Sequence, residues 1–516
     1  MKLEKSTQIV LSVVVAVLMM VAMSDQVLAE GNAYLGGGTA ADQWEDAEYQ
    51  VLIKNVNIFD GKTDKLIEGM DVVIIGEHIA RIAQSPIKVK TEELTITLDG
   101  GGRTLMPGLI DCHAHLMLNG PFGLMESDFT EGDVHTRAVY KAKRYLMDGF
   151  TSVRDVGGPA FGLKRSIDAG LVEGPRIYPS GAFISQTSGH GDFRSRNDPN
   201  PMFSGCGDYS NFGRFGIGQI ADGRAQVLAA TRQQLMQGAS QVKIMGGGGG
   251  SSKYDPIDTT QYTLDEMKAA VDACDDWNTY VCSHIFTDKA VNRALDAGFK
   301  TFEHAFFVTE PTIKRIAEEG AFVVPQTWGI SPELFNNPLV PKSKHAAIKE
   351  MHDKAKDFAP LLLKHKVKVG FATDAVGDLD DSWGARRYEL YFHAELFGSN
   401  FQCLKHATST AGELLALSGP RNPYPGKLGV IEEGALADIL IVDGNPLEDL
   451  SVLGANPKWF GAPRPKQLDT LRLIMKDGVF FKCTLPDKEE ASAKLLEIQE
   501  RRHEMGKQNR MAYPEF

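Results

Sequence analysis

The chain has 516 residues, of which 43% are hydrophobic and 24% are charged. This is the composition of a soluble globular protein long enough for one large domain and a smaller one. The formal net charge of −12 at pH 7 argues against nucleic acid or an anionic membrane as a partner.

The first residues have the form of a secretory signal peptide. Two lysines precede an apolar run over residues 9–23, and Val27-Leu28-Ala29 offers small or apolar side chains at a cleavage position. We expect a signal peptide over residues 1–29, a flexible lead-in over 30–48, and a secreted or periplasmic protein. An uncleaved anchor is the alternative, but the apolar run is short for a membrane span, so we expect no stable membrane anchor.

Both ends of the remaining chain contain strand-like segments. Alternating apolar and polar residues over 51–82, with a turn at Asp60-Gly61, predict short antiparallel strands, and matching segments lie between residues 437 and 481. We expect these two parts, over residues 49–105 and 421–485, to form one small β-sandwich with a second domain inserted between them.

Helix-like and strand-like segments alternate over the inserted part, residues 106–420. Thr263-Leu264-Asp265-Glu266 is a capping box that begins one helix, and Gly298 ends the next. Short apolar runs follow these helices, and this alternation predicts an α/β fold with parallel strands joined by crossover helices.

Two further segments stand apart from this alternation. Residues 185–223 are rich in Gly, Phe, Asn and Arg and too long for an ordinary loop, so we expect an active-site insertion. A charged helix or tail over residues 486–516 is expected to pack peripherally or to contact a second subunit, and we expect a homo-oligomer.

Candidate metal ligands lie at or near the ends of several strand-like runs. His113 and His115 end one run, and side chains two apart on a strand face the same way, so both imidazoles reach one point. Imidazole suits zinc and related metals. Because a (β/α)8 barrel gathers its active site at the carboxyl ends of its strands, we expect such a barrel with a metal centre. Four further runs contain or end in Lys243, His284, His304 and Asp374.

This ligand set resembles that of the amidohydrolase superfamily. The segments 149–155, Gly189-His190-Gly191-Asp192 and Tyr254-Asp255-Pro256 are similar to the branch with Xaa-Pro dipeptidases, metallo-carboxypeptidases and ochratoxinase-like amidases. The resemblance covers roughly residues 49–482 and implies a TIM barrel, two divalent ions with zinc as the expected metal, and a carboxylated lysine at Lys243. One departure is the glycine run 246–250, where the family has a Ser-Gly-Gly-Val type of loop, so we expect a more flexible loop.

The residue types permit a hydrolytic mechanism. The first histidine pair with Asp374 can hold one ion, and His284 with His304 can hold a second, so a bridging anion is needed. Lys243 as an ammonium has no acceptor, but a neutral amine can take up CO₂ and form a carbamate with two oxygens. The alternative for Lys243 is a snorkelling side chain or an ion pair with Asp374. A hydroxide between the ions then attacks the substrate carbonyl, with Asp374 as general base and then acid.

Three other polar residues are candidates for contact with substrate. His190 can bind or polarise the substrate carbonyl, or it is a structural loop histidine. Tyr254 can meet a substrate carboxylate, or it is a surface tyrosine. Arg154 can pair with the same carboxylate, or with its neighbour Asp155.

We therefore expect a metal-dependent hydrolase that cleaves an amide or peptide C–N bond and releases an amino acid from a small-molecule or dipeptide substrate. Cyclic-amide hydrolysis of the imidazolonepropionase type is the alternative reaction. A non-catalytic barrel that only binds its ligand is the alternative of a different class.

The signal peptide yields a direct prediction. Export should remove the first 29 residues, because the small residue Ala29 closes the segment after the apolar run. N-terminal sequencing of secreted material should then begin at or near Glu30. An intact Met1 recovered from the membrane fraction would support the anchor instead.

Overall fold

The computed structural model describes residues 50–89, 95–204, 210–252, 254–336, 345–459 and 467–485. The chain divides into two compact units, Met1–Glu48 and Tyr49–Phe516. The predicted signal peptide, the lead-in and the C-terminal helix lie outside the described residues. Among the helices in the described ranges, none has both the length and the apolar character that a membrane span requires.

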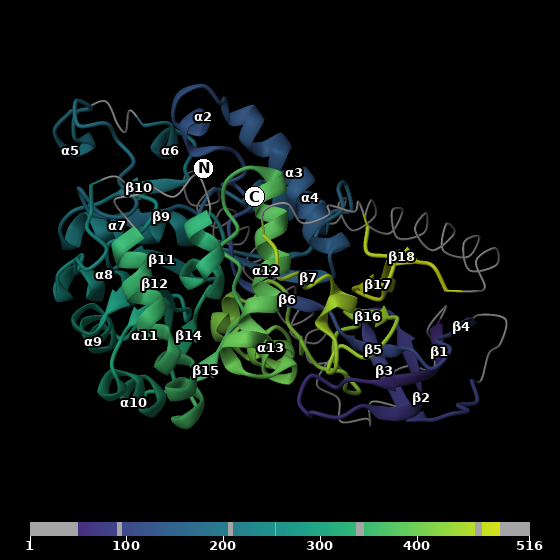
Figure 1. The fold of residues 1–516 in the computed structure, drawn as a ribbon. Helices are drawn as coiled ribbons and strands as arrows, with labels where there is room; N and C mark the ends of the chain where they lie inside the picture. The colour runs from purple at the N-terminus through teal and green to yellow at the C-terminus, as the bar shows by residue number, and fades with distance from the viewer. Residues whose placement is uncertain are drawn as a thin grey trace, which may run out of the picture. The chain divides into compact units, whose positions relative to one another are not determined.

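Strands from both ends of the second unit form one sheet (Figure 1). β5 joins the two groups, because it pairs in parallel with β1 and antiparallel with β16. The sheet branches at β1, which pairs with β2, β4 and β5. The hydrogen bonds thus form one branched sheet, where the expected sandwich has two separate sheets. Its strands are β1 (Gln50–Ile58), β2 (Ile67–Ile75), β3 (His78–Gln84), β4 (Thr95–Asp99), β5 (Thr104–Pro107), β16 (Ile439–Val442), β17 (Leu471–Lys476) and β18 (Val479–Cys483).

The segment between these ends contains two parallel sheets. One has the order β6-β7-β8, and the other has the order β10-β9-β11-β12-β13-β14-β15. Their strands are β6 (Leu109–Ala114), β7 (Phe150–Asp155), β8 (Arg176–Pro179), β9 (Phe183–Ser185), β10 (Gly218–Ile220), β11 (Val242–Met245), β12 (Val281–Thr287), β13 (Thr301–Phe307), β14 (Phe322–Val324) and β15 (Lys368–Val369).

Backbone hydrogen bonds connect the two parallel sheets at two places. The amide of Cys112 in β6 donates to the carbonyl of Phe371 at 2.8 Å, just after β15. At the second place the amide of Ser240, just before β11, donates to the carbonyl of Pro179 in β8 at 2.8 Å. The segment after β15 therefore lies beside β6, although the two are far apart in sequence.

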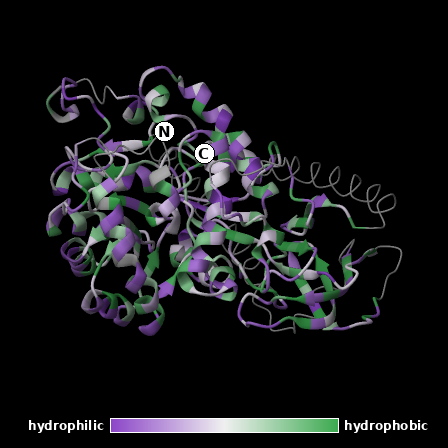
Figure 2. Cartoon of the chain, viewed as in Figure 1, coloured by the Kyte–Doolittle hydropathy of each residue, from purple (hydrophilic) through white to green (hydrophobic). Residues whose placement is uncertain are grey.

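Helices separate the parallel strands, as the alternation predicts. Thr263 and Glu266 form the expected capping box at the start of α8, and Gly298 ends α9 with a left-handed φ of +104°. The helices alternate polar and apolar stretches, whereas the strands are mainly hydrophobic (Figure 2). The helices are α2 (Phe122–Ser127), α3 (Glu131–Met147), α4 (Phe161–Asp168), α5 (Pro201–Ser204), α6 (Asn211–Arg214), α7 (Arg224–Met236), α8 (Leu264–Asp276), α9 (Asp288–Ala297), α10 (Glu310–Glu318), α11 (His345–Lys364), α12 (Leu379–Phe397), α13 (Asn400–His406) and α14 (Ser409–Leu415), with 3-10 helices η3 (Thr327–Ile330), η4 (Pro332–Asn336), η6 (Ala416–Arg421) and η7 (Leu450–Leu453).

A buried ion pair ties the branched sheet to the parallel strands. Arg176 of β8 donates to both carboxylate oxygens of Asp438, each at 3.2 Å, and also pairs with Asp477. Asp438 directly precedes β16, so this guanidinium fixes the position at which the chain returns to the branched sheet. Burial of these charges is tolerated because each has a partner.

Candidate metal centre

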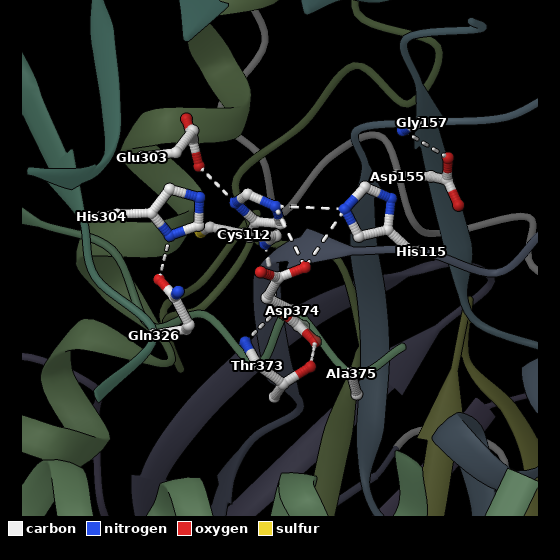
Figure 3. Close-up of polar contacts among 12 residues, drawn as sticks. Cys112, His115, Asp155, Gly157, Glu303, His304, Gln326, Thr373, Asp374 and Ala375 are labelled. Atoms are coloured by element: carbon white, nitrogen blue, oxygen red, sulfur yellow. Dashed lines mark hydrogen bonds and ion pairs between the residues drawn. The ribbon is translucent and has the colours of Figure 1, made fainter. Parts of the chain in front are cut away.

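Three of the predicted ligands converge at one point. His113, His304 and Asp374 each offer one ligand atom, and these atoms lie within 4.8 Å of one another. His113 comes from β6, His304 from β13, and Asp374 from the segment after β15. Figure 3 shows His304 and Asp374 together with His115, Glu303 and Gln326. The cluster therefore forms from parallel strands that approach one another only in the folded chain.

Hydrogen bonds fix two of these imidazoles with their Nε2 atoms toward the cluster. Nδ1 of His113 lies 2.8 Å from a carboxylate oxygen of Glu303, and Nδ1 of His304 bonds the side-chain oxygen of Gln326. Nε2 of His113 lies 3.5 Å from Asp374. Nε2 of His304 is buried and has no hydrogen-bond partner in the described part of the chain. A ligand histidine typically shows this pattern, with one nitrogen held by an acceptor and the other left for a metal. The residues therefore fit a divalent ion.

His115 extends the cluster on its other side. Its Nε2 lies 3.2 Å from Oδ1 of Asp374 and 3.2 Å from Nε2 of His113. The His-x-His pair thus meets one carboxylate oxygen, as expected for two side chains on the same face of a strand.

The structure places Lys243 and His284 beside this cluster. Lys243 is 1% exposed, and burial lowers the pKa of its amine, against the charges of Glu303 and Asp374. The ring of His284 lies 4.4 Å from that of His304, and its Nε2 is 3.0 Å from the carbonyl oxygen of Gly248. In this arrangement only Nδ1 of His284 remains for a metal.

Burial keeps three of the site histidines neutral. It lowers the pKa of His113 and His284 well below the usual value and that of His304 to about 3. Burial raises the pKa of Asp374, but its hydrogen bond with His115 and its interactions with His304 and Lys243 outweigh this, so its pKa lies below the usual value. A neutral imidazole and an ionised carboxylate are the forms that coordinate a metal.

Two of the ligands have strained backbones. His304 has a φ of +72° and Asp374 a φ of +42°, in the left-handed region that residues other than glycine rarely adopt. Each such residue destabilises the fold by roughly 1–3 kcal/mol, and persists only where its surroundings hold it. Such strain is concentrated at functional sites, which agrees with the role predicted for both residues.

His190 and Tyr254 both lie on loops. The ring of His190 stacks on that of His284, with centroids 3.9 Å apart. Tyr254 is 39% exposed, and the guanidinium of Arg196 lies 5.0 Å from the centre of its ring. Its exposed ring gives Tyr254 access to a ligand, and Arg196 adds a positive charge beside it.

Arg154 lies elsewhere than the sequence analysis suggested. Its side chain is fully buried and donates to both carboxylate oxygens of Glu303 at 2.8 Å. It also donates to the carbonyl of Cys112 at 2.5 Å. The substrate-binding role is therefore corrected, since a guanidinium enclosed in this way cannot reach a ligand. The alternative partner Asp155 is also wrong, because the carboxylate that Arg154 contacts is Glu303.

The sequence analysis missed the residues that hold these ligands. Glu303 was detectable as a charged residue inside an apolar strand-like run, because a carboxylate there must be paired. Asp111 accepts from the amides of His113 and Thr373, both at 3.0 Å, and nothing in the local sequence indicates Thr373 as its partner. Gln326 carries no local signal at all.

The corrected position of Arg154 leads to a prediction. Arg154→Met should lower the free energy of unfolding by about 3 kcal/mol or more, because Glu303 is left buried without its cation. Bound metal should fall as well, because Glu303 orients His113. Chemical denaturation and elemental analysis measure the two effects, with Arg232→Met, at an exposed arginine of α7, as the matched control. A substrate-binding Arg154 would instead raise KM and leave stability unchanged.

Comparisons with known proteins agree with this geometry. A profile of the Amidohydrolase family matches residues 104–480. Ochratoxinase of Aspergillus niger is 32% identical over 365 residues, which cover 67% of this chain and 72% of that protein. A crystal structure of a prolidase complexed with N-methylphosphonate-L-proline has a TM-score of 0.73 at 34% identity, and covers 84% of this chain and 100% of that one. The crystal structure of A. niger ochratoxinase has a TM-score of 0.70 at 26% identity, and covers 85% of this chain and 96% of that one. The chain therefore belongs to the amidohydrolase family and is a hydrolase that acts on C–N bonds.

Proposed function

We propose that the protein hydrolyses an amide or peptide bond whose leaving part is an amino acid, in the manner of Xaa-Pro dipeptidases, N-acyl amino acid amidases or carboxypeptidases. The observation that carries this proposal is the cluster of His113, His304 and Asp374, in which an ionised carboxylate lies among neutral imidazoles. The similarity to a prolidase with a bound L-proline derivative and to an ochratoxinase supports the amide class.

The proposed scaffold is a closed (β/α)8 barrel. Its strands are β6, β7 and β8 followed by β11 to β15, which are parallel wherever they pair within each sheet. The hydrogen bonds from Cys112 to Phe371 and from Ser240 to Pro179, which connect the two sheets, support closure. The cluster then lies at the carboxyl ends of the strands, where barrel enzymes carry their active sites.

The proposed cofactors are two divalent ions, with zinc as the expected metal. His113, His115 and Asp374 would hold one, and His304 with Nδ1 of His284 would hold the other. Lys243, as an N6-carboxylated lysine, would bridge them, and its lowered amine pKa supports the neutral form that takes up CO₂. Bound ions of this kind lower the pKa of water and polarise a carbonyl.

Side chains of this protein carry out proton transfer and bind the substrate in the proposed reaction. Asp374 accepts the proton of the attacking water and returns it to the leaving nitrogen, as general base and then acid. His190 donates a hydrogen bond to the oxygen of the scissile carbonyl, where negative charge develops. Tyr254 with Arg196 receives the carboxylate of the leaving amino acid, and replaces Arg154 in that role.

We also propose that the protein is exported. The signal peptide over residues 1–29 would place the enzyme outside the cytoplasm, where it would meet small amides or dipeptides. A homo-oligomer and the absence of nucleic-acid and membrane partners stay predictions from the sequence.

A hydrolysis screen tests the reaction. The zinc-loaded protein should release a free amino acid from N-acyl amino acids or Xaa-Pro dipeptides, as measured by amino-acid analysis. Asp374→Asn should lower kcat by at least about 100-fold, because the amide cannot accept the proton. Asp380→Asn, at an exposed aspartate of α12, is the control. Turnover confined to lactam-type rings would favour the imidazolonepropionase type of reaction instead.

Lys243 gives the second test. Lys243→Ala should lose metal and activity together, and acetate or propionate should partly restore both by supplying the missing oxygens. Lys243→Arg should fail as well, because a guanidinium stays charged and cannot become an anionic ligand. Elemental analysis of the zinc-loaded protein in bicarbonate measures the metal. Near-normal metal content and rate in Lys243→Arg would refute the carbamate.

A further inference from the structure

His190 is held by two side chains of the loop that follows β11. Its Nδ1 lies 2.8 Å from Oγ of Ser252 and 3.6 Å from Oδ2 of Asp255. The side chain of Ser252 also lies against the Asp255 carboxylate. The three side chains are almost completely buried, so water does not compete for these contacts. Nε2 of His190 makes no hydrogen bond to the part of the chain that the structure describes.

Asp255 is itself fixed from two sides. Its Oδ2 accepts from the amide of Gly249 at 2.9 Å and from the side-chain nitrogen of Gln261 at 3.2 Å. The side-chain oxygen of Gln261 accepts in turn from the amide of His190 at 2.9 Å. Burial raises the pKa of Asp255, but its contacts with His190 and Ser252 outweigh this and hold it below the usual value. The group is therefore a buried carboxylate in a closed set of hydrogen bonds.

The glycine run explains how the ring of His190 fits beside this loop. A Cβ atom on Gly249 would lie 1.9 Å from ring atoms of His190, and one on Gly248 would lie 1.8 Å from the carbonyl oxygen of Pro256. A Cβ on Gly250 would meet nothing within 4 Å. The amides of Gly248 and Gly249 are both hydrogen bonded, and the flexibility expected of this run stays a prediction.

We infer that Ser252 and Asp255 are positioning residues that hold Nδ1 of His190. Gly249, because it has no side chain, leaves the space that this ring occupies. This inference rests on the proposed function, in which His190 donates to the scissile carbonyl. With Nδ1 occupied by Ser252 and the Asp255 carboxylate behind it, the imidazole presents Nε2 toward substrate. In the neutral tautomer whose Nδ1 accepts from the Ser252 hydroxyl, Nε2 carries the proton that the ring donates, so this contact sets which nitrogen acts as the donor.

The adjacent glycines provide a matched pair of variants. Gly249→Ala should lower kcat about 100-fold, comparable to the loss of one oxyanion donor, because the methyl group displaces the ring. Gly250→Ala should stay within about twofold, because the added Cβ meets open space. Ala-Pro and N-acetyl-L-phenylalanine are the test substrates for this assay. Both variants should keep the parent's metal content and melting temperature. Equal losses in the two variants would overturn the assignment of Gly249.

A double-mutant cycle separates positioning from general stability. Asp255→Asn should lower kcat about tenfold in the parent but less than twofold in a His190→Ala background, because its effect passes through His190. KM and metal content should change little. The same tenfold loss in both backgrounds would show that Asp255 acts independently of His190, and would overturn the inference.

Crystal structures decide the inference even if the parent hydrolyses neither substrate. In Gly249→Ala and Asp255→Asn the ring of His190 should leave its stack on His284, and in Gly250→Ala it should stay. An unmoved ring in the first two variants would refute the positioning role. An inactive parent with displaced rings would refute the proposed function and leave the positioning role intact.

Discussion

One buried guanidinium joins the strands on which the candidate site is built. Arg154 of β7 donates to the carbonyl of Cys112 in β6 and to the side chains of Thr301 and Glu303 in β13. It also donates at 3.3 Å to the hydroxyl of Tyr280, which directly precedes β12. Burial of a charge is strongly unfavourable unless the charge is paired and hydrogen bonded, so these strands can occupy only an arrangement that satisfies this group. The second oxygen of Glu303 then orients His113, and the same ion pair serves both the fold and the site.

Two further buried polar side chains act on the loops at the strand ends. The amine of Lys141 in α3 donates to the carbonyls of His115, Leu118 and Ala375, and so links the loop after β6 to the residue next to Asp374. Glu389 of α12 accepts from the amides of Thr327 and Trp328, at the start of η3. These amides directly follow Gln326, which bonds His304. Each of these side chains binds backbone groups, so each fixes the path of a loop rather than a single side chain. This over-determination is consistent with the left-handed conformations of His304 and Asp374.

Local patterns in the sequence predicted the elements and the ligands, but not what holds them. The capping box at Thr263 and the left-handed Gly298 depend on neighbours within a few residues, and both are confirmed. The pairing of His113 with Glu303 spans 190 residues, and no periodicity encodes it. The partner of Arg154 could not be predicted from local sequence either. Its neighbour Asp155 is a plausible partner in the sequence, whereas the carboxylate that it contacts lies 149 residues away. The branched sheet was missed for a similar reason. Alternation predicts strands, while the double pairing of β5 depends on which strands meet in space.

The candidate site has two parts, which differ in how readily their residues can be substituted. The ligands lie on strands or strand ends, and their partners are buried polar or charged side chains whose loss leaves an unpaired group, so substitution there destabilises the fold. His190, Tyr254 and Arg196 lie on loops, and loops accept changes in length and sequence more readily than strands. Asp255 and Gly249 connect the parts, because they place a loop histidine against His284 through contacts made within the loops. A change of substrate can therefore arise in the outer loops while the metal centre stays intact. The glycine run is the exception among the loops, since a side chain at Gly249 would enter the space that the ring of His190 occupies.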